Sequence, residues 1–64
     1  MDYEIVSGNK KVYIKLDSGG RPVTCGKFER GKFEKGKAKN ILNGLPKTLR
    51  KFHFKMEAIP EIPP

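Results

Sequence analysis

One segment of the chain, residues 27–55, must supply both the hydrophobic core and most of the positive charge. It contains ten of the fourteen Lys and Arg residues but only two acids, Glu29 and Glu34. It also contains most of the large apolar residues, namely Phe28, Phe33, Ile41, Leu42, Leu45, Leu49, Phe52 and Phe54. The same segment therefore has to build the core and carry the charge.

The size of the chain limits how it can be stabilised. A chain of 64 residues forms one small domain, which buries only about 60% of the surface that its unfolded form exposes. Cys25 is the only cysteine, so a disulfide within the chain is excluded, and Cys25 with His53 falls short of the four ligands of a structural zinc site. We predict no metal and no cofactor. The remaining ways to stabilise so small a domain are close packing, a bound ligand or a partner subunit, and we expect a homo-oligomer.

The N-terminal part of the chain predicts three short strands. Residues 3–6 and 11–17 flank a Gly-Asn turn and form a hairpin. In the second strand Val12, Ile14 and Leu16 alternate with polar residues and with Tyr13, which we expect on the solvated face. Residues 21–25 form the third strand, in which Pro22 indicates an edge or a strand start.

A five-residue repeat follows the strands. Gly-Lys-Phe-Glu-Arg at 26–30 is followed by Gly-Lys-Phe-Glu-Lys at 31–35. A period of five fits neither a helix nor a strand, so we predict a loop or a bent edge with one Phe in the core and the other capping it or exposed.

Residues 35–43 have the spacing of an amphipathic helix. Ala38, Ile41, Leu42 and Leu45 form one apolar stripe, and Gly44 is placed for a left-handed residue at the helix end. Residues 46–51 predict one further helical turn, with Leu49 inward and Lys47, Arg50 and Lys51 outward.

Residues 52–59 alternate and predict the last strand. We therefore predict an α+β fold, a small antiparallel β-β-β-α-β sheet with one helix packed on one face. The pattern leaves open whether the last strand lies at the edge or in the centre. We expect one domain over residues 1–59 and a proline-rich tail over 60–64.

The charge distribution points to an anionic ligand. Residues 27–55 carry a net charge of +8, within a total of +7, and such a potential attracts nucleic acid, a nucleotide or an acidic protein surface. Lysines outnumber arginines eleven to three, which suits phosphate contact more than base readout. The candidate ligand-binding residues are Lys27, Arg30, Lys32, Lys35, Lys37, Lys39, Arg50, Lys51 and Tyr13.

Two local patterns resemble ligand sites. Residues 26–32 and 31–37 have the Gly-x4-Gly-Lys spacing of a phosphate loop, but Phe33 and Ala38 replace the Ser or Thr that would bind magnesium. A glycine-bent backbone leading into a helix N-terminus can still hold a phosphate, although a solvated basic loop explains the same residues. Tyr13, between Lys11 and Lys15, is placed to stack a nucleobase, or it is one amphipathic ring on a strand face.

Catalysis is hard to build from these residues. The seven acids are scattered, and no Ser, Cys or His has a partner at a catalytic spacing. Cys25 is either a low-pKa thiol near Lys27 or a buried, inert one, and His53 is predicted to face solvent or a partner. We therefore expect that the protein is not an enzyme. The acidic N-terminus and the short apolar runs indicate neither a signal peptide nor a membrane span, so we expect a cytoplasmic protein.

The layout of residues 12–59 resembles small uncharacterised proteins encoded by phages of low-GC bacteria. The similarity lies in Gly20 to Cys25, in Lys37 to Leu42 and in Leu45 to Phe52. It implies an accessory protein in the host cytoplasm that counters a host defence, and it transfers no functional residue. The residues themselves favour a non-enzymatic binding module for nucleic acid or a nucleotide. The alternative is an inhibitor or adaptor that docks on a protein.

Overall fold

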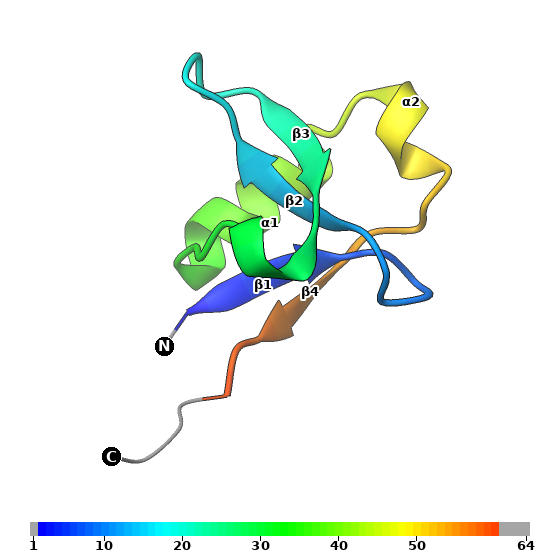
Figure 1. Ribbon diagram of the computed structural model, residues 1–64. Coiled ribbons are helices and arrows are strands. Elements are labelled where there is room, and N and C mark those ends of the chain that lie inside the picture. The colour runs from blue at the N-terminus through cyan, green and yellow to red at the C-terminus, as the bar shows by residue number, and fades with distance from the viewer. Residues whose placement is uncertain (1, 61–64) are drawn as a thin grey trace.

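The computed structural model describes residues 2–60 of the chain. Its elements are β1 (Tyr3–Val6), β2 (Tyr13–Leu16), β3 (Pro22–Cys25), the 3-10 turn η1 (Lys27–Glu29), α1 (Lys35–Asn43), α2 (Lys47–Arg50) and β4 (Lys55–Ala58). The four strands form one antiparallel sheet, and the main helix α1 covers one face of it (Figure 1). The predicted α+β class and the order of its elements are confirmed. Residues 61–64, most of the predicted proline-rich tail, lie outside the described residues.

The strand order is β3-β2-β1-β4. The last strand therefore lies at an edge, where it pairs with β1 in the register Ile5 to Met56. This answers the question that the sequence left open. The opposite edge is β3, which begins at Pro22. A proline at the start of an edge strand is expected, because it has no N–H to donate to a neighbour.

Away from their connecting turn, β1 and β2 separate, and the second copy of the repeat, residues 31–35, lies between them. The two strands are in register at Val6 and Tyr13. Further along, Tyr3 exchanges two backbone hydrogen bonds with Phe33, of 2.7 and 2.9 Å, and the Gly31 N–H donates to the Ile14 carbonyl at 3.1 Å. The repeat therefore crosses the sheet between its two central strands.

The core lies between the sheet and α1. Its buried side chains come from β1, β2, the second repeat and the helical segment: Ile5, Ile14, Phe33, Ala38 and Leu45. Ile41 and Leu42 pack against them, so the predicted apolar stripe of α1 is confirmed. Phe33 is 6% exposed and Phe28 is 96% exposed, which confirms that only one of the two repeat rings enters the core.

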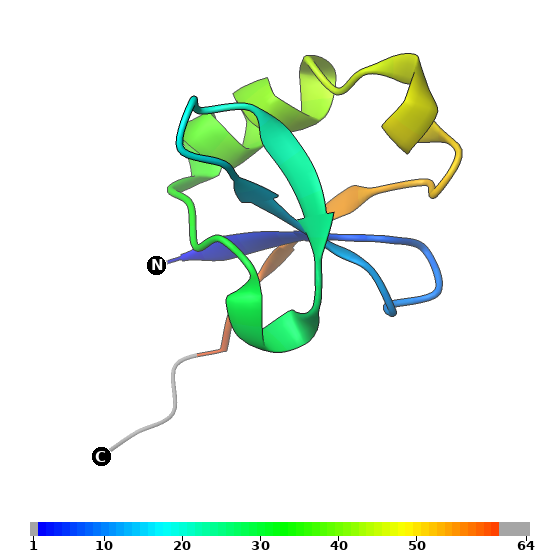
Figure 2. The ribbon, with the colours of Figure 1, turned by 45° about the horizontal axis from the view of Figure 1, so that its top comes forward.

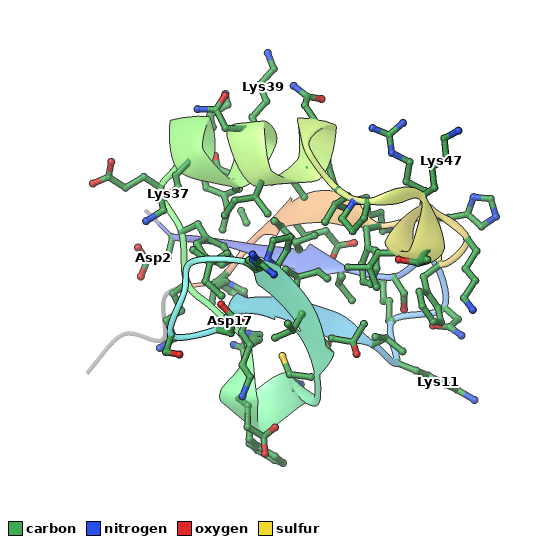
Figure 3. All side chains as sticks on the ribbon, turned by 90° about the horizontal axis from the view of Figure 1, so that it is seen from above. Asp2, Lys11, Asp17, Lys37, Lys39 and Lys47 are labelled. Atoms are coloured by element: carbon green, nitrogen blue, oxygen red, sulfur yellow. The ribbon has the colours of Figure 1, made fainter. Side chains whose placement is uncertain are left out.

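The two helices follow each other along one side of the sheet, and η1 lies on the other side (Figures 2 and 3). The bounds of α1 are the predicted ones, and residues 47–50 form the predicted extra turn. Gly44 has φ −99°, so the prediction of a left-handed residue there was wrong. Its N–H donates to the Asn40 and Ile41 carbonyls without that conformation.

Two strand predictions need correction. The last strand begins at Lys55, not at residue 52, because His53 takes a positive φ of 56° and interrupts the extended backbone. The second strand begins at Tyr13, not at residue 11. The expectation that Tyr13 lies on a solvated face was also wrong, since its side chain is 7% exposed.

Within residues 2–60, neither helix is long and apolar enough to cross a membrane. The same residues hold no group of three His, Cys, Asp or Glu side chains placed to bind a metal ion.

Candidate functional site

The face of the sheet that points away from α1, called here the outer face, has its charges paired. Side chains alternate along a strand, so Glu4 and Glu57 project opposite to the core residues Ile5 and Met56. The two glutamates are direct cross-strand neighbours, and like charges in such positions repel. Cations offset this repulsion: Arg30 lies 3.1 Å from Glu4, and Lys55 and Lys10 lie 3.1 and 3.8 Å from Glu57.

The contacts of the Arg30 side chain all lie on this face. Its Nη1 donates to the Lys27 carbonyl at 2.7 Å, and its guanidinium lies 6.0 Å from the centre of the Tyr13 ring. The Arg30 and Glu4 side chains are 18% and 12% exposed. The buried Nε makes no aligned hydrogen bond to a described residue, so its contact with Glu4 is an ion pair. Arg30 therefore holds the first repeat against the sheet and covers Tyr13.

The opposite side of the molecule is different. Residues 32–51, called here the helical layer, contain seven basic residues and one acid, Glu34. All seven are exposed: Lys32, Lys35, Lys37, Lys39, Lys47, Arg50 and Lys51. None of them forms an ion pair with any residue between 2 and 60, because all three ion pairs there involve the outer face. The helical layer thus presents uncompensated positive charge.

These cations are spread over α1, α2 and the residues next to them, and Lys37 lies toward the hollow that Leu16 and Pro22 line. Figure 3 shows Lys39 and Lys47 projecting away from the sheet, whereas Lys11 projects from the opposite side of the molecule. Lys47 belongs to this surface but is missing from the candidates chosen from the sequence, although its proline-started turn also carries Arg50 and Lys51. Six of the candidates lie in the helical layer with their charge exposed: Lys32, Lys35, Lys37, Lys39, Arg50 and Lys51.

Arg50 also has a structural role. Its Nε donates to the Leu45 carbonyl at 3.0 Å and its Nη2 to the Asn43 carbonyl at 3.2 Å. A helix leaves its last carbonyls without intrahelical donors. Arg50 donates to the carbonyl of Asn43, the last residue of α1, and to that of Leu45 in the segment that follows. Its positive charge also suits the C-terminal end of α1.

Three candidates are not brought into the helical layer. Arg30 and Tyr13 contact each other on the outer face, and Lys27 lies in η1 beside them. Together with Glu4 and Glu57 they line a hollow of about 350 Å³. Two acids among its lining residues lower its positive potential, so the hollow is poorly suited to an anion.

The two phosphate-loop spacings do not form a phosphate loop. Residues 27–29 form the turn η1, and Phe33 pairs with β1. The backbone of these residues therefore does not form a loop that could enclose a phosphate. Gly36 lies inside the first turn of α1, and Glu34 precedes that helix at the N-cap position. A carboxylate there disfavours a second anion at the helix N-terminus.

Two other hollows border the helical layer, and neither collects lysines. One, of about 350 Å³, is lined by Leu16, Pro22 and Ile41, with Lys37 as its one basic side chain. The other, of about 260 Å³, lies between α1 and α2 and includes Arg50 and His53. His53 is exposed, as predicted.

Cys25 does not have the features of a reactive thiolate. Its side chain is half-buried, and burial raises the pKa of the thiol above the ordinary value of 9.0. Lys15 opposes that shift and Glu29 adds to it. Of the two interpretations that the sequence allowed, the low-pKa thiol is therefore wrong.

The fold and the charge distribution define a small α+β protein with a charge-paired sheet face and a basic helical layer. In comparisons with protein-family models, curated proteins and solved structures, the chain matches none of them.

Proposed function

We propose that this protein is a non-enzymatic binding module whose helical layer contacts the phosphate backbone of nucleic acid. The observation that supports it is the contrast in charge pairing: the acids of the outer face have cationic partners, whereas the exposed cations of the helical layer have none among residues 2–60. When lysines neutralise phosphates, the counterions condensed on the nucleic acid are released, and this release drives binding.

The spacing of the cations favours nucleic acid over a single nucleotide. Lys35, Lys37 and Lys39 lie along α1, Lys47 begins α2, and Lys51 directly follows α2. A small ligand needs convergent groups around a concave site, but none of the three hollows described above is lined by more than two basic side chains. An extended chain of phosphates can contact several cations that are spread along two helices.

The same residues predict low sequence specificity. The guanidinium of Arg50 is held by backbone carbonyls, so the remaining cations of the layer are lysines. A lysine is a point charge that contacts phosphate well but lacks the planar fork used for bidentate base recognition.

Fluorescence anisotropy with a labelled single-stranded oligonucleotide tests the proposal. Binding should weaken steeply between about 50 and 200 mM salt. In the triple variant K35Q/K37Q/K39Q the slope of log K against log salt should become shallower by about 2, since each contact to a single strand contributes about 0.7.

A charge-matched control is available on other parts of the surface. Lys10, Lys11 and Arg21 are exposed and lie outside the helical layer, so K10Q/K11Q/R21Q removes the same charge. This variant should keep most of the original slope. Equal loss in both triple variants would show a general charge effect and no helical-layer site, and binding insensitive to salt would exclude the proposal.

One observation favours protein docking as a second candidate function. Phe28 is 96% exposed at the tip of η1, and the Arg30 contacts with Lys27 and Glu4 hold this turn in place. An exposed aromatic ring on a turn that is held in place is a typical anchor for a partner's apolar pocket. In a phage accessory protein, the proposed partner is a host protein.

A pull-down from nuclease-treated lysate separates the two candidates. Docking through Phe28 predicts a stoichiometric protein partner that is retained in high salt and lost in F28A. The triple variant K35Q/K37Q/K39Q should retain that partner. A partner released by nuclease treatment would instead support nucleic-acid binding alone.

A further inference from the structure

The two edges of the sheet differ in what their backbones can offer. In an antiparallel pair, residues with both backbone groups turned toward the partner strand alternate with residues whose groups point away. The Asp17 N–H donates to the Arg21 carbonyl, so Pro22 and Thr24 point their backbone groups to the free side of β3. Pro22 has no N–H, and this edge therefore lacks a donor where a neighbouring strand would need one.

The β4 edge has a complete set of donors and acceptors. The Ile59 N–H donates to the Asp2 carbonyl at 2.8 Å, which places Glu57 and Lys55 in the positions hydrogen-bonded to β1. Met56 and Ala58 consequently turn their N–H and C=O groups to the free side. The carbonyl of Phe54, which lies across a planar trans peptide bond from the Lys55 N–H, points the same way. β1 is the only strand among residues 2–60 that pairs with β4, and Figure 1 shows β4 at the border of the sheet.

The side chains of β4 complement a second copy of themselves. If Met56 lies opposite Met56 of another copy in antiparallel register, Lys55 lies opposite Glu57, and Phe54 lies opposite Ala58. Met56 and the Phe54–Ala58 pairs then occupy hydrogen-bonded positions. The Lys55–Glu57 pairs occupy the other positions, where side chains approach most closely. A charged edge strand usually prevents edge-to-edge pairing, but this one is attractive toward itself.

We propose that the β4 edge is the interface for a second copy of this chain, which joins two four-stranded sheets into one antiparallel sheet. The symmetry axis runs perpendicular to the sheet, so both helical layers lie on the same face. The dimer also follows the expectation that so small a domain gains stability by oligomerisation. If the proposed function holds, the dimer doubles the basic surface that a nucleic acid meets, but the pairing itself does not depend on that function.

Sedimentation equilibrium of the protein without nucleic acid tests the interface directly. The weight-average mass should rise with concentration from 7.3 kDa toward twice that value. The variant E57K places Lys55 opposite a lysine in both symmetric pairs and should weaken the dimer by about tenfold, whereas the charge-swapped K55E/E57K should restore it. A mass of one chain at every concentration, or equal dimerisation in E57K, would overturn the proposal.

Proline substitutions on the two edges provide a backbone test that leaves charge unchanged. In A58P the missing N–H is one that β1 does not use, so the monomer keeps its ladder while the dimer loses hydrogen bonds. The matched control T24P removes an outward N–H from the β3 edge and should leave dimerisation intact. Circular dichroism checks that both variants fold. Dissociation by T24P but not by A58P would place the contact on β3 and refute the β4 interface.

Discussion

The outer face and the helical layer treat charge in opposite ways. On the outer face two neighbouring glutamates are matched by Arg30, Lys55 and Lys10. In the helical layer seven basic side chains are exposed, and none pairs with an acid in the described part of the chain. Pairing on one side serves the fold, whereas unpaired lysines on the other side contribute no ion pair to stability. The helical layer is therefore the surface to test for binding.

The five-residue repeat joins these two sides and shows how little its local sequence decides. Its first copy lies on the outer face, where Arg30 turns back to Glu4 and Phe28 is left in solvent. Its second copy crosses between β1 and β2, places Phe33 in the core and ends at Lys35, the first residue of α1. The backbone partners of each copy determine its role.

The largest expected effect distinguishes the two phenylalanines. F33A should lower the free energy of unfolding by about 3–5 kcal/mol, because it empties a core position under α1, and a domain of this size has little stability to lose. F28A should change it by less than about 0.5 kcal/mol. Urea denaturation followed by circular dichroism measures both, and similar losses in the two variants would contradict the assignment.

The second-largest expected effect distinguishes Arg30 from Lys35, the fifth residues of the two copies of the repeat. R30A removes the ion pair with Glu4 and the hydrogen bond to Lys27, and it leaves a mostly buried carboxylate without its partner. We expect a loss of about 1–3 kcal/mol. The exposed Lys35 has no ion pair with a described residue, so K35A serves as the control and should be nearly neutral by the same denaturation measurement.

Within the helical layer, Arg50 should matter more than its neighbour Lys47. R50A removes two side-chain donors from the carbonyls of Leu45 and Asn43 and should cost about 1 kcal/mol. K47A should change stability by less than half of that. If R50A proved as neutral as K47A in thermal unfolding, the two hydrogen bonds to carbonyls would not be stabilising the end of α1.

The smallest effect concerns Cys25 and pH. Burial raises the pKa of its thiol in the folded state, so its contribution to stability is present below about pH 9 and is lost as pH rises through the folded-state pKa. The stability difference between the wild type and C25A should therefore shrink above pH 9. Alkylation of the folded protein should also be slower than that of the unfolded chain, and K15Q should slow it further. Faster alkylation in the folded state would contradict the raised pKa.

The sequence was sufficient to identify the elements with a clear period. The stripe of Ala38, Ile41 and Leu42 located α1 to the residue. The two strands with the clearest alternation, predicted at 11–17 and 52–59, were right in type but began two and three residues too early. The interruption at His53 was not predictable, because a positive φ is uncommon for any residue other than glycine and depends on the surrounding backbone. Tyr13 was misplaced because alternation gives a side chain's direction but not what covers it.

The sequence predicted which residues carry the positive charge of the candidate site, but not how those residues are arranged in space. The basic segment identified the helical layer, since exposed lysines on a helix follow from its apolar stripe. It could not show that Arg30 crosses to the outer face, because Glu4 lies 26 residues earlier in the chain and only the opened hairpin brings the two together. The β4 edge was likewise invisible until the strand order was known.

The most direct test of nucleic-acid binding by the helical layer is an NMR titration of the 15N-labelled protein with a short single-stranded oligonucleotide at low salt. We expect the changes in amide shift to cluster in residues 32–51, with the largest changes around Lys35 to Lys39 and near Lys47. Changes concentrated on the outer face, around Glu4, Tyr13 and Glu57, or no changes at all, would contradict it.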